Sequence, residues 1–140
     1  MSSRLFSRAE KIEFNFLFSI LIKVYGMPFI DYNAKPKIKI WEGIYGQVHH
    51  SKQLTCARIA IAAGINLPEH QHIHEQWSHL LEGEMEFVVG GEKRLMKSGE
   101  TAYIPGNVPH SARTLTDCKL IDVFNPVRED WIELEKNQLG

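Results

Sequence analysis

Residues 64–76, GINLPEHQHIHEQ, carry histidines at positions 70, 72 and 74 and a glutamine at 76. Imidazole nitrogens are common ligands for transition metals, so this stretch predicts a metal site. Side chains two residues apart in a strand point to one face, so we expect His70, His72 and His74 to share a face. A further ligand must come from the following bend or strand, where Gln76 lies. The segment therefore predicts a metal site with an uncharged amide among its donors.

Two later stretches carry polar side chains that such a site can use. In IPGNVPH, His110 follows a turn and can close the site from a distant part of the sheet. In CKLIDVFNPVRED, Asp122 and Phe124 share one strand face, and Arg128 follows them. A carboxylate that points into a barrel needs a partner, because burying an unpaired charge is costly. Asp122 is therefore either part of a structural ion pair or a catalytic group.

Short strands separated by glycine and proline turns must position these residues. LTCARIAIA (54–62) and KLIDVFNP (119–126) are β-rich runs, and MEFVV and KRLM flank a tight hairpin turn at Gly90-Gly91. The tail DWIELEKNQ is expected to form a short helix capped by Asp130. Several short strands with such turns indicate an all-β sandwich or barrel.

The stretch GINLPEHQHIHEQWSHLLEG resembles the first sequence motif of the cupin family, which runs from Gly64 to Gly83 here. That motif contains His-x-His, then three residues and a glutamate, so His74 falls outside its register. The stretch GETAYIPGNVPHSART (99–114) resembles the second motif, with Asn107 at a usual glycine and Thr114 at a usual asparagine. The metal ligands that the resemblance implies are His70, His72, Gln76 and His110.

The resemblance covers about residues 36–128 and implies a double-stranded β-helix, or jelly-roll barrel, with one divalent transition metal ion inside. Zn, Ni, Fe, Mn and Co all suit an imidazole-rich site. Gln76 stands where the family usually has glutamate, which makes all four ligands neutral. Such a site keeps nearly its full positive charge, so we expect a strong Lewis acid that favours an anionic ligand.

A closer resemblance concerns the glutamine ligand together with the pattern D-x-F-x-P-x-R-E-D. Both are similar to the pectin-degradation cupins that ketonise 4,5-unsaturated monouronates. This resemblance implies an isomerase-like enzyme for a small anionic sugar. In family terms Asp122 would transfer protons, Arg128 would orient the substrate carboxylate and Phe124 would wall the pocket. The alternatives are an iron-dependent dioxygenase with the same ligands and a non-catalytic sugar- or metal-binding module.

The composition narrows the functional classes further. A formal net charge of −1 over 140 residues argues against nucleic-acid binding, which needs a basic surface. No run approaches the ~20 apolar residues of a membrane span. Two cysteines without metal or redox spacing, Cys56 and Cys118, are expected to be reduced thiols of a cytoplasmic protein, with a disulfide as the alternative. A homodimer is expected because small cupins frequently dimerise.

Residues 1–26 differ in composition from residues 27–140, which we assign to the barrel domain. The run FNFLFSILI (14–22) resembles a short signal segment, but Glu10 and Glu13 precede it and no cleavage site follows. We expect a leader ahead of a natural start at Met27. The alternatives are a packing extension and a targeting or membrane-surface segment.

The remaining aromatic and histidine side chains have simpler interpretations than a site. Trp41 and Trp77 are expected in the core, with a sugar-stacking platform as the alternative. Of the other histidines, we expect His49 and His50 to be exposed to solvent and His74 and His79 to lie at the rim or surface.

Overall fold

The computed structural model describes residues 7–25 and 29–140, with the side chains of residues 18 and 20–25 outside the description. The chain divides into two compact units, Met1–Asp31 and Tyr32–Gly140. The expected domain boundary at Met27 falls outside the described residues, so it stays a prediction.

The first unit contains helix α1 (Arg8–Tyr25). A capping box begins it: the Ser7 hydroxyl accepts a hydrogen bond from the Glu10 amide, and the Glu10 carboxylate accepts one from the Ser7 amide. The sequence had suggested an apolar segment here without indicating a helix. Among residues 7–25 and 29–140, no helix is long and apolar enough to cross a membrane.

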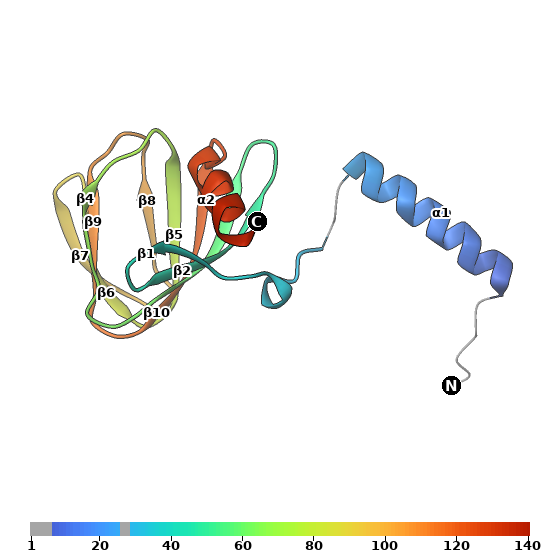
Figure 1. The fold of residues 1–140 in the computed structure, drawn as a ribbon. Coiled ribbons are helices and arrows are strands. Elements are labelled where there is room, and N and C mark those ends of the chain that lie inside the picture. Colours follow the sequence, from blue (N-terminus) through green and yellow to red (C-terminus); the bar gives the residue numbers. More distant parts are fainter. Residues whose placement is uncertain (1–6, 26–28) are drawn as a thin grey trace. The chain divides into compact units, whose positions relative to one another are not determined.

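The second unit is a barrel of two antiparallel sheets that face each other (Figure 1). One sheet has the strand order β1-β2-β3-β10-β5-β8, and the other has the order β4-β9-β6-β7. This arrangement confirms the expected jelly-roll barrel. The strands are β1 (Ile38–Trp41), β2 (Ile44–His50), β3 (Thr55–Ile61), β4 (Asn66–His70), β5 (Glu75–Glu82), β6 (Glu84–Val89), β7 (Glu92–Lys97), β8 (Thr101–Ile104), β9 (His110–Thr114) and β10 (Cys118–Asn125), with a 3-10 helix η1 (Tyr32–Ala34) before them and helix α2 (Glu129–Leu139) after them.

The barrel interior changes from apolar to polar along two neighbouring strands. Alternate residues of β5 and β10 point inward, as the two-residue period of a strand requires. Leu80 and Leu120 lie opposite each other and belong to the apolar core. One step further along, the paired inward residues are Ser78 and Asp122. The sheet therefore holds the polar side chains together at one end of the barrel.

Two glycine turns fix the strand connections. Gly90 and Gly91 both have positive φ, as the tight hairpin between β6 and β7 requires, which confirms the expected turn. Gly83 has a φ of 99°, and a Cβ added there would lie 2.3 Å from the Asp117 carbonyl oxygen. A side chain is therefore excluded at Gly83, where β5 passes into β6.

Helix α2 packs on the barrel through Trp131, which is buried in the core cluster. Its Gln138 amide group exchanges two hydrogen bonds with the backbone of Lys39, both 2.8 Å long, and so protects the edge strand β1. The expected cap at Asp130 was wrong. The helix begins at Glu129, so the cap position belongs to Arg128, which makes no side-chain cap bond. Asp130 lies inside the first turn, and its carboxylate pairs with the Arg128 guanidinium.

The core assignment of two tryptophans was also wrong. Trp41 and Trp77 are 53% and 51% exposed. Trp77 lies on the outer face of the six-stranded sheet, with its ring centroid 4.7 Å from that of Tyr103. Cys56 and Cys118 are free thiols, as expected.

The prediction that His49 and His50 are exposed was wrong as well, because both are half-buried. The His50 side chain is 13% exposed, and its Nδ1 lies 2.8 Å from the Thr55 hydroxyl. Its Nε2 lies 3.7 Å from the Glu135 carboxylate of α2. Contacts from β3 and α2, which are distant in sequence, cover this histidine.

Candidate metal centre

The polar end of the barrel is built by strand ends from both sheets. His70 is the last residue of β4, and His110 is the first residue of β9; the two lie opposite each other in the β4–β9 pair. His72 lies in the loop between β4 and β5, beyond the end of the strand. The expected sharing of one strand face therefore does not apply to His72 and His74, because the strand ends before them.

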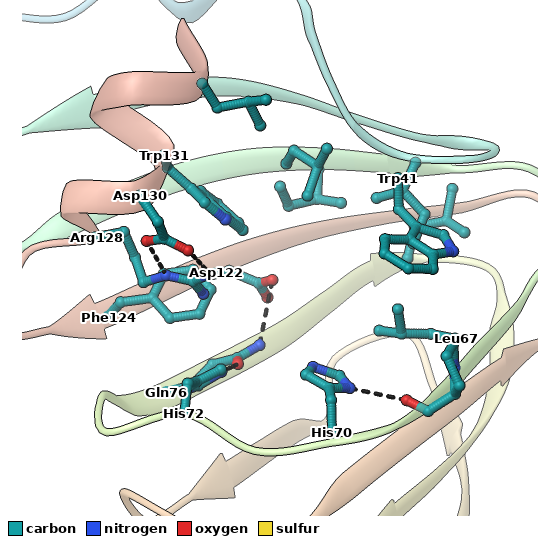
Figure 2. Close-up of a pocket in the computed structure, with 16 residues that line it drawn as sticks. Trp41, Leu67, His70, His72, Gln76, Asp122, Phe124, Arg128, Asp130 and Trp131 are labelled. Carbon is teal, nitrogen blue, oxygen red and sulfur yellow. Dashed lines mark hydrogen bonds and ion pairs between the residues drawn. The ribbon is translucent and has the colours of Figure 1, made fainter.

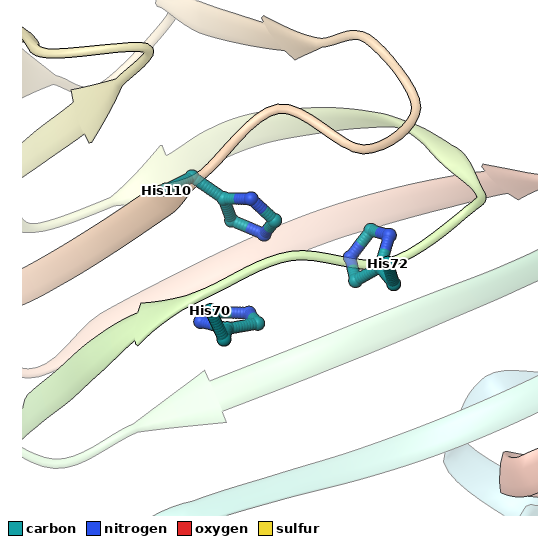
Figure 3. A group of neighbouring side chains, drawn as sticks. All are labelled: His70, His72 and His110. Carbon is teal, nitrogen blue, oxygen red and sulfur yellow. The ribbon is translucent and has the colours of Figure 1, made fainter.

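His70, His72 and His110 form one compact group (Figure 3). One ring nitrogen from each lies within 4.8 Å of the others, a spacing at which a single ion can be held. His74 is not a member of this group, in agreement with the cupin register. The barrel therefore contains a three-histidine group that can hold a metal.

Each ring of the group is tethered to the backbone through Nδ1. His70 Nδ1 lies 2.8 Å from the Pro68 carbonyl, His72 Nδ1 lies 3.0 Å from the His74 carbonyl, and His110 Nδ1 lies 2.9 Å from the Val108 carbonyl. A carbonyl oxygen can only accept, so each Nδ1 must carry the proton. Each Nε2 is then a bare lone pair, the form in which imidazole binds metals.

The surroundings favour the neutral form of two of these rings, His72 and His110. Burial lowers the pKa of His72 to about 4, and the nearby positive charge of Arg128 adds to the effect. Burial also lowers the pKa of His110. The His110 Nε2 is buried and has no hydrogen-bond partner in the described structure. A buried acceptor without a partner is costly, and a cation in the group would satisfy it.

Gln76 adds an oxygen from β5. Its Nε2 donates to the Ser78 hydroxyl at 2.9 Å and to the Asp122 carboxylate at 3.3 Å, which fixes the orientation of the amide. Its Oε1 then lies 3.2 Å from the His72 Nε2, so two lone pairs face each other. Because neither atom can donate, a shared cation is what makes this contact favourable. The residues present thus fit a metal with three nitrogen donors and one neutral oxygen donor.

Asp122 lies beside Gln76 and is buried. Its Oδ1 accepts a 2.5 Å hydrogen bond from the Ser78 hydroxyl, and its Oδ2 accepts the bond from Gln76. Burial raises the pKa of Asp122 to about 6, against the opposing effects of the Ser78 hydrogen bond and the charge of Arg128. Both of these donors are neutral, so within residues 7–25 and 29–140 the carboxylate accepts no hydrogen bond from a charged group.

Arg128 belongs to a separate network at the rim. Its guanidinium donates two hydrogen bonds to Asp130, at 2.9 and 2.7 Å, and lies 4.9 Å from the Phe124 ring centroid and 4.5 Å from that of Trp131. Its backbone N–H donates to the Thr55 hydroxyl at 2.9 Å. The ion pair of Arg128 is therefore with Asp130, not with Asp122.

These residues surround a cavity of about 460 Å³ (Figure 2). Of the expected metal ligands and catalytic residues, His70, His72, Gln76, Asp122, Phe124 and Arg128 line this cavity. His110 does not line it but belongs to the histidine group. The polar or aromatic lining residues are Trp41, His70, His72, Gln76, Asp122, Phe124, Arg128, Asp130 and Trp131.

Three contributors were missed from the sequence. Ser78 is two residues after Gln76 and therefore shares its inward face, which was a usable signal. Asp130 had been assigned to capping, and Trp131 had not been singled out. Their contribution depends on where α2 docks on the barrel, which local patterns do not specify.

The barrel topology and the inward-facing histidine group are those of a cupin. The sequence profile described as "Cupin domain" matches residues 57–124, which contain all four expected ligands. The solved structure of an RmlC-like cupin from Shewanella frigidimarina superimposes with a TM-score of 0.71 and 29% identity, over 75% of this chain and 96% of that one.

Two relatives specify the family further. The pectin degradation protein KdgF of Dickeya dadantii (strain 3937) is 34% identical over 80 residues, which are 56% of this chain and 72% of that protein. The structure of KdgF from Halomonas sp. has a TM-score of 0.69 and 28% identity, over 76% of this chain and 98% of that one. The chain therefore belongs to the pectin-degradation cupins represented by KdgF.

Proposed function

We propose that this protein is a metal-dependent, isomerase-like enzyme that converts 4,5-unsaturated monouronates to linear, ketonised sugars. The observation that carries the proposal is one cavity lined by two members of the three-histidine group, His70 and His72, together with Gln76 and the buried Asp122. The family relationship supports it, because the Dickeya relative is a pectin degradation protein. The dioxygenase and the non-catalytic module are not favoured by any feature of the site.

The proposed metal ligands are His70, His72, Gln76 and His110. When bound, one divalent transition metal ion such as Zn, Ni, Fe, Mn or Co would act as a Lewis acid for substrate oxygens. The neutral ligand set supports this role, since it leaves the positive charge available to an anionic substrate.

The reaction that we propose is an isomerisation: protons are transferred, and substrate and product have the same atoms. The anomeric hydroxyl loses its proton, an aldehyde forms, and the bond between the anomeric carbon and the ring oxygen breaks. The released enol oxygen becomes a ketone when carbon 4 gains a proton. Asp122 is proposed to take the proton from oxygen and to return one to carbon. Its position in the cavity wall supports this role, because it is the buried carboxylate beside the proposed ligands.

Arg128 is proposed to orient the substrate carboxylate. Asp130 engages Nε and one terminal nitrogen, which leaves the other terminal nitrogen of the planar fork for an anion. Phe124 lies beneath the guanidinium and beside His72, with ring centroids 5.8 Å apart. We propose that this ring walls the pocket between the metal ligands and the arginine.

The test is a ketonisation assay on unsaturated galacturonate. The reaction is monitored through the loss of absorbance of the conjugated double bond. Metal content is measured by elemental analysis on the same sample. We expect turnover that requires the metal and consumes no oxygen. Oxygen consumption coupled to turnover would identify a dioxygenase instead. Metal binding without turnover of any unsaturated uronate would contradict the enzyme assignment.

We also propose a homodimer and a cytoplasmic location. Trp77 on β5 pairs with Tyr103 on β8, and Ile121 on β10 lies diagonally from Trp77. All three side chains are exposed on the outer face of the six-stranded sheet, where a second copy can cover them. Free Cys56 and Cys118 support a reducing compartment. Light scattering after size exclusion should give twice the chain mass, and the mass of a single chain would contradict the dimer.

A further inference from the structure

Trp41 is a large aromatic residue on the wall of the cavity. It is 53% exposed, and it lines the same space as the histidines. Figure 2 shows Trp41 on the opposite side of that space from Asp122 and Arg128. An aromatic ring that is half in water gains free energy when a ligand covers it. The cavity therefore offers a bare aromatic face opposite its charged groups.

The hairpin that carries Trp41 is tied to the barrel on both sides. Trp41 is the last residue of β1, and the pairing of β1 with β2 shifts register between Lys39 and Trp41, an irregularity that can re-aim a side chain. The Lys39 backbone exchanges two hydrogen bonds with the Gln138 side chain of α2. In the turn, the Gly43 carbonyl accepts a 3.0 Å hydrogen bond from the Ala62 N–H. The backbone that presents the indole is thus fixed before a ligand arrives, which lowers the cost of binding.

An indole face suits the closed ring of a uronate. A pyranose ring carries C–H groups on its faces and its hydroxyls and carboxylate around its edge, so the faces are its less polar part. In a 4,5-unsaturated uronate, the double bond is conjugated with the carboxylate, which flattens that part of the ring. Such a face can stack on an aromatic ring while the hydroxyls at the edge keep their hydrogen bonds. A carboxylate held near Arg128 and the histidines leaves the ring to extend toward Trp41.

We propose that Trp41 is a specificity-determining residue whose indole stacks on the face of the closed uronate ring, while the carboxylate lies at Arg128 and the metal ligands. The inference deepens the proposed function and rests on it for the class of ligand. The cavity of about 460 Å³ is within the ~300–1,000 Å³ range of small-molecule sites, which accommodates a monosaccharide. A linear sugar acid has no ring face for the indole. Trp41 therefore favours the closed substrate over open-chain acids, the linear product included.

The first test separates binding from chemistry. In Trp41→Ala, KM for unsaturated galacturonate should rise about tenfold with kcat within about twofold of the unchanged protein, because stacking holds the ring both before and during the reaction. Trp41→Leu keeps an apolar side chain without a flat face and should behave like Trp41→Ala. Trp41→Phe restores a flat ring and should recover most of the loss. A merely structural role would lower metal content or melting temperature, so both are measured on each variant.

The second test asks whether the contact is made with a ring. Galacturonate has a closed ring and no double bond to ketonise, whereas galactonate is an open-chain acid with the same number of carbons. Binding of each to the full chain loaded with Zn²⁺ is measured by isothermal titration calorimetry. We expect Trp41→Ala to weaken galacturonate about tenfold, which corresponds to about 1.4 kcal/mol, and to leave galactonate within about twofold. Equal weakening of the two acids, an unchanged affinity for galacturonate, or no binding of galacturonate to the unchanged protein would overturn the inference.

Tyr45→Ala is the matched control. Tyr45 is an aromatic residue of the same hairpin, is 43% exposed, and lies on the outer side of β2, away from the cavity that Ile44 lines. Its removal should alter neither KM nor the affinity for galacturonate. A Tyr45→Ala protein that loses affinity as Trp41→Ala does would show that the ligand needs the intact hairpin and not the indole face.

Failure of the proposed function gives a different result. Galacturonate binding that depends on Trp41, without turnover of unsaturated galacturonate, would leave this inference standing and contradict the uronate activity. Turnover of the uronate with a KM that does not respond to Trp41→Ala would do the reverse.

Discussion

Asp122 and Asp130 line the same cavity and have opposite surroundings. Asp122 is buried and accepts hydrogen bonds from two neutral side chains, Ser78 and Gln76. Asp130 is at the rim with a side chain that is 59% exposed, and it pairs with the guanidinium of Arg128. Burial raises the pKa of Asp122 to about 6, whereas the hydrogen bonds from Arg128 lower the pKa of Asp130. Two carboxylates of one cavity are thus held in different electrostatic states.

The difference suggests a division of roles. We call Gln76, Ser78 and Asp122 the floor network, and Arg128 with Asp130 the rim network. A carboxylate without a charged hydrogen-bonding partner can exchange a proton. In the floor network, Asp122 is such a carboxylate, and it lies beside the histidines. A carboxylate in a bidentate ion pair is committed to its partner and holds the arginine in place. The expected roles are therefore proton transfer at the floor and anion placement at the rim.

The largest expected effect comes from removing one of the proposed metal ligands beside the floor network. His72→Ala or His110→Ala deletes one of the inward Nε2 donors, so metal content should fall from about one ion per chain to near zero, with turnover lost. His74→Ala is the matched control, since His74 lies outside the group, and should keep its metal. Elemental analysis of the three variants decides. An empty His74→Ala protein beside a loaded His72→Ala protein would refute the ligand assignment.

Exchanging each carboxylate for an amide tests the comparison directly. Asp122→Asn should lower kcat by ~10²-fold or more, the usual scale for a lost general acid or base. Metal content and melting temperature should stay close to those of the unchanged protein. Asp130→Asn should lower kcat much less, because its partner Arg128 remains in the cavity.

Steady-state kinetics on unsaturated galacturonate would measure both variants. Unchanged turnover in the Asp122 variant would remove the proposed mechanism even with the metal in place. A larger loss in the Asp130 variant would reverse the assignment of roles between floor and rim.

Arg128→Lys sharpens the role of the rim network. A lysine keeps the charge and loses the planar fork that pairs with Asp130, so KM should rise about five- to tenfold with a smaller change in kcat. Arg58→Lys is a matched control, because Arg58 is on β3 and bonds Asn33 away from the cavity. If kcat falls with KM unchanged, Arg128 acts in the chemical step rather than in placing the anion.

Thr55→Val tests how the rim network is anchored to the barrel. The change keeps the side-chain shape and removes the hydroxyl that bonds His50 Nδ1 and also accepts from the Arg128 backbone N–H. Leaving that partly buried group unpaired should lower the free energy of unfolding by about 1–3 kcal/mol, with metal content unchanged. Thr101→Val, which removes an exposed hydroxyl bonded to His79, should cost less. Denaturant titration of both variants gives the comparison, and equal losses would show that the anchor contributes little.

The smallest effect is expected from removing residues 1–26. Both networks lie within the second unit, so kcat should change less than about twofold and metal content not at all. The full chain, assayed beside the truncated one, is the control. A truncated chain that does not fold or arrives without metal would show that the first unit supports the barrel.

The sequence predicted the barrel and its histidine group because both depend on local constraints. Gly83 must lack a side chain because a Cβ there would meet the Asp117 carbonyl. A glycine required at a fixed position shows in the sequence where the motif ends, and the ligand positions are counted within the motif. Strand alternation also placed Asp122 correctly on the inward face. Ligand spacing, turn residues and strand period are all properties of a few neighbouring residues, so one sequence is enough to show them.

The failures concern residues whose surroundings come from far along the chain. His50 precedes a polar turn and looks exposed, but Thr55 and Glu135 enclose it. Asp130 has the position of a helix cap, yet a guanidinium two residues earlier binds it. Trp41 has a large apolar side chain of the kind expected in a core, but it lines the cavity instead. Each outcome depends on how α2 or a sheet edge docks, and docking is decided by the sum of many distant contacts.

The backbone tethers on the three histidines have a consequence for metal exchange. Each ring loses its rotational freedom when the barrel folds, not when an ion arrives, so little ordering entropy remains to be lost on binding. The metal-free barrel is then a preformed chelator, and one ion can replace another without refolding. Because N and O donors of this kind accept several divalent ions, occupancy follows the relative supply of those ions. With the proposed ligand set, the identity of the bound metal would depend on the cell's supply of metal ions as much as on the barrel.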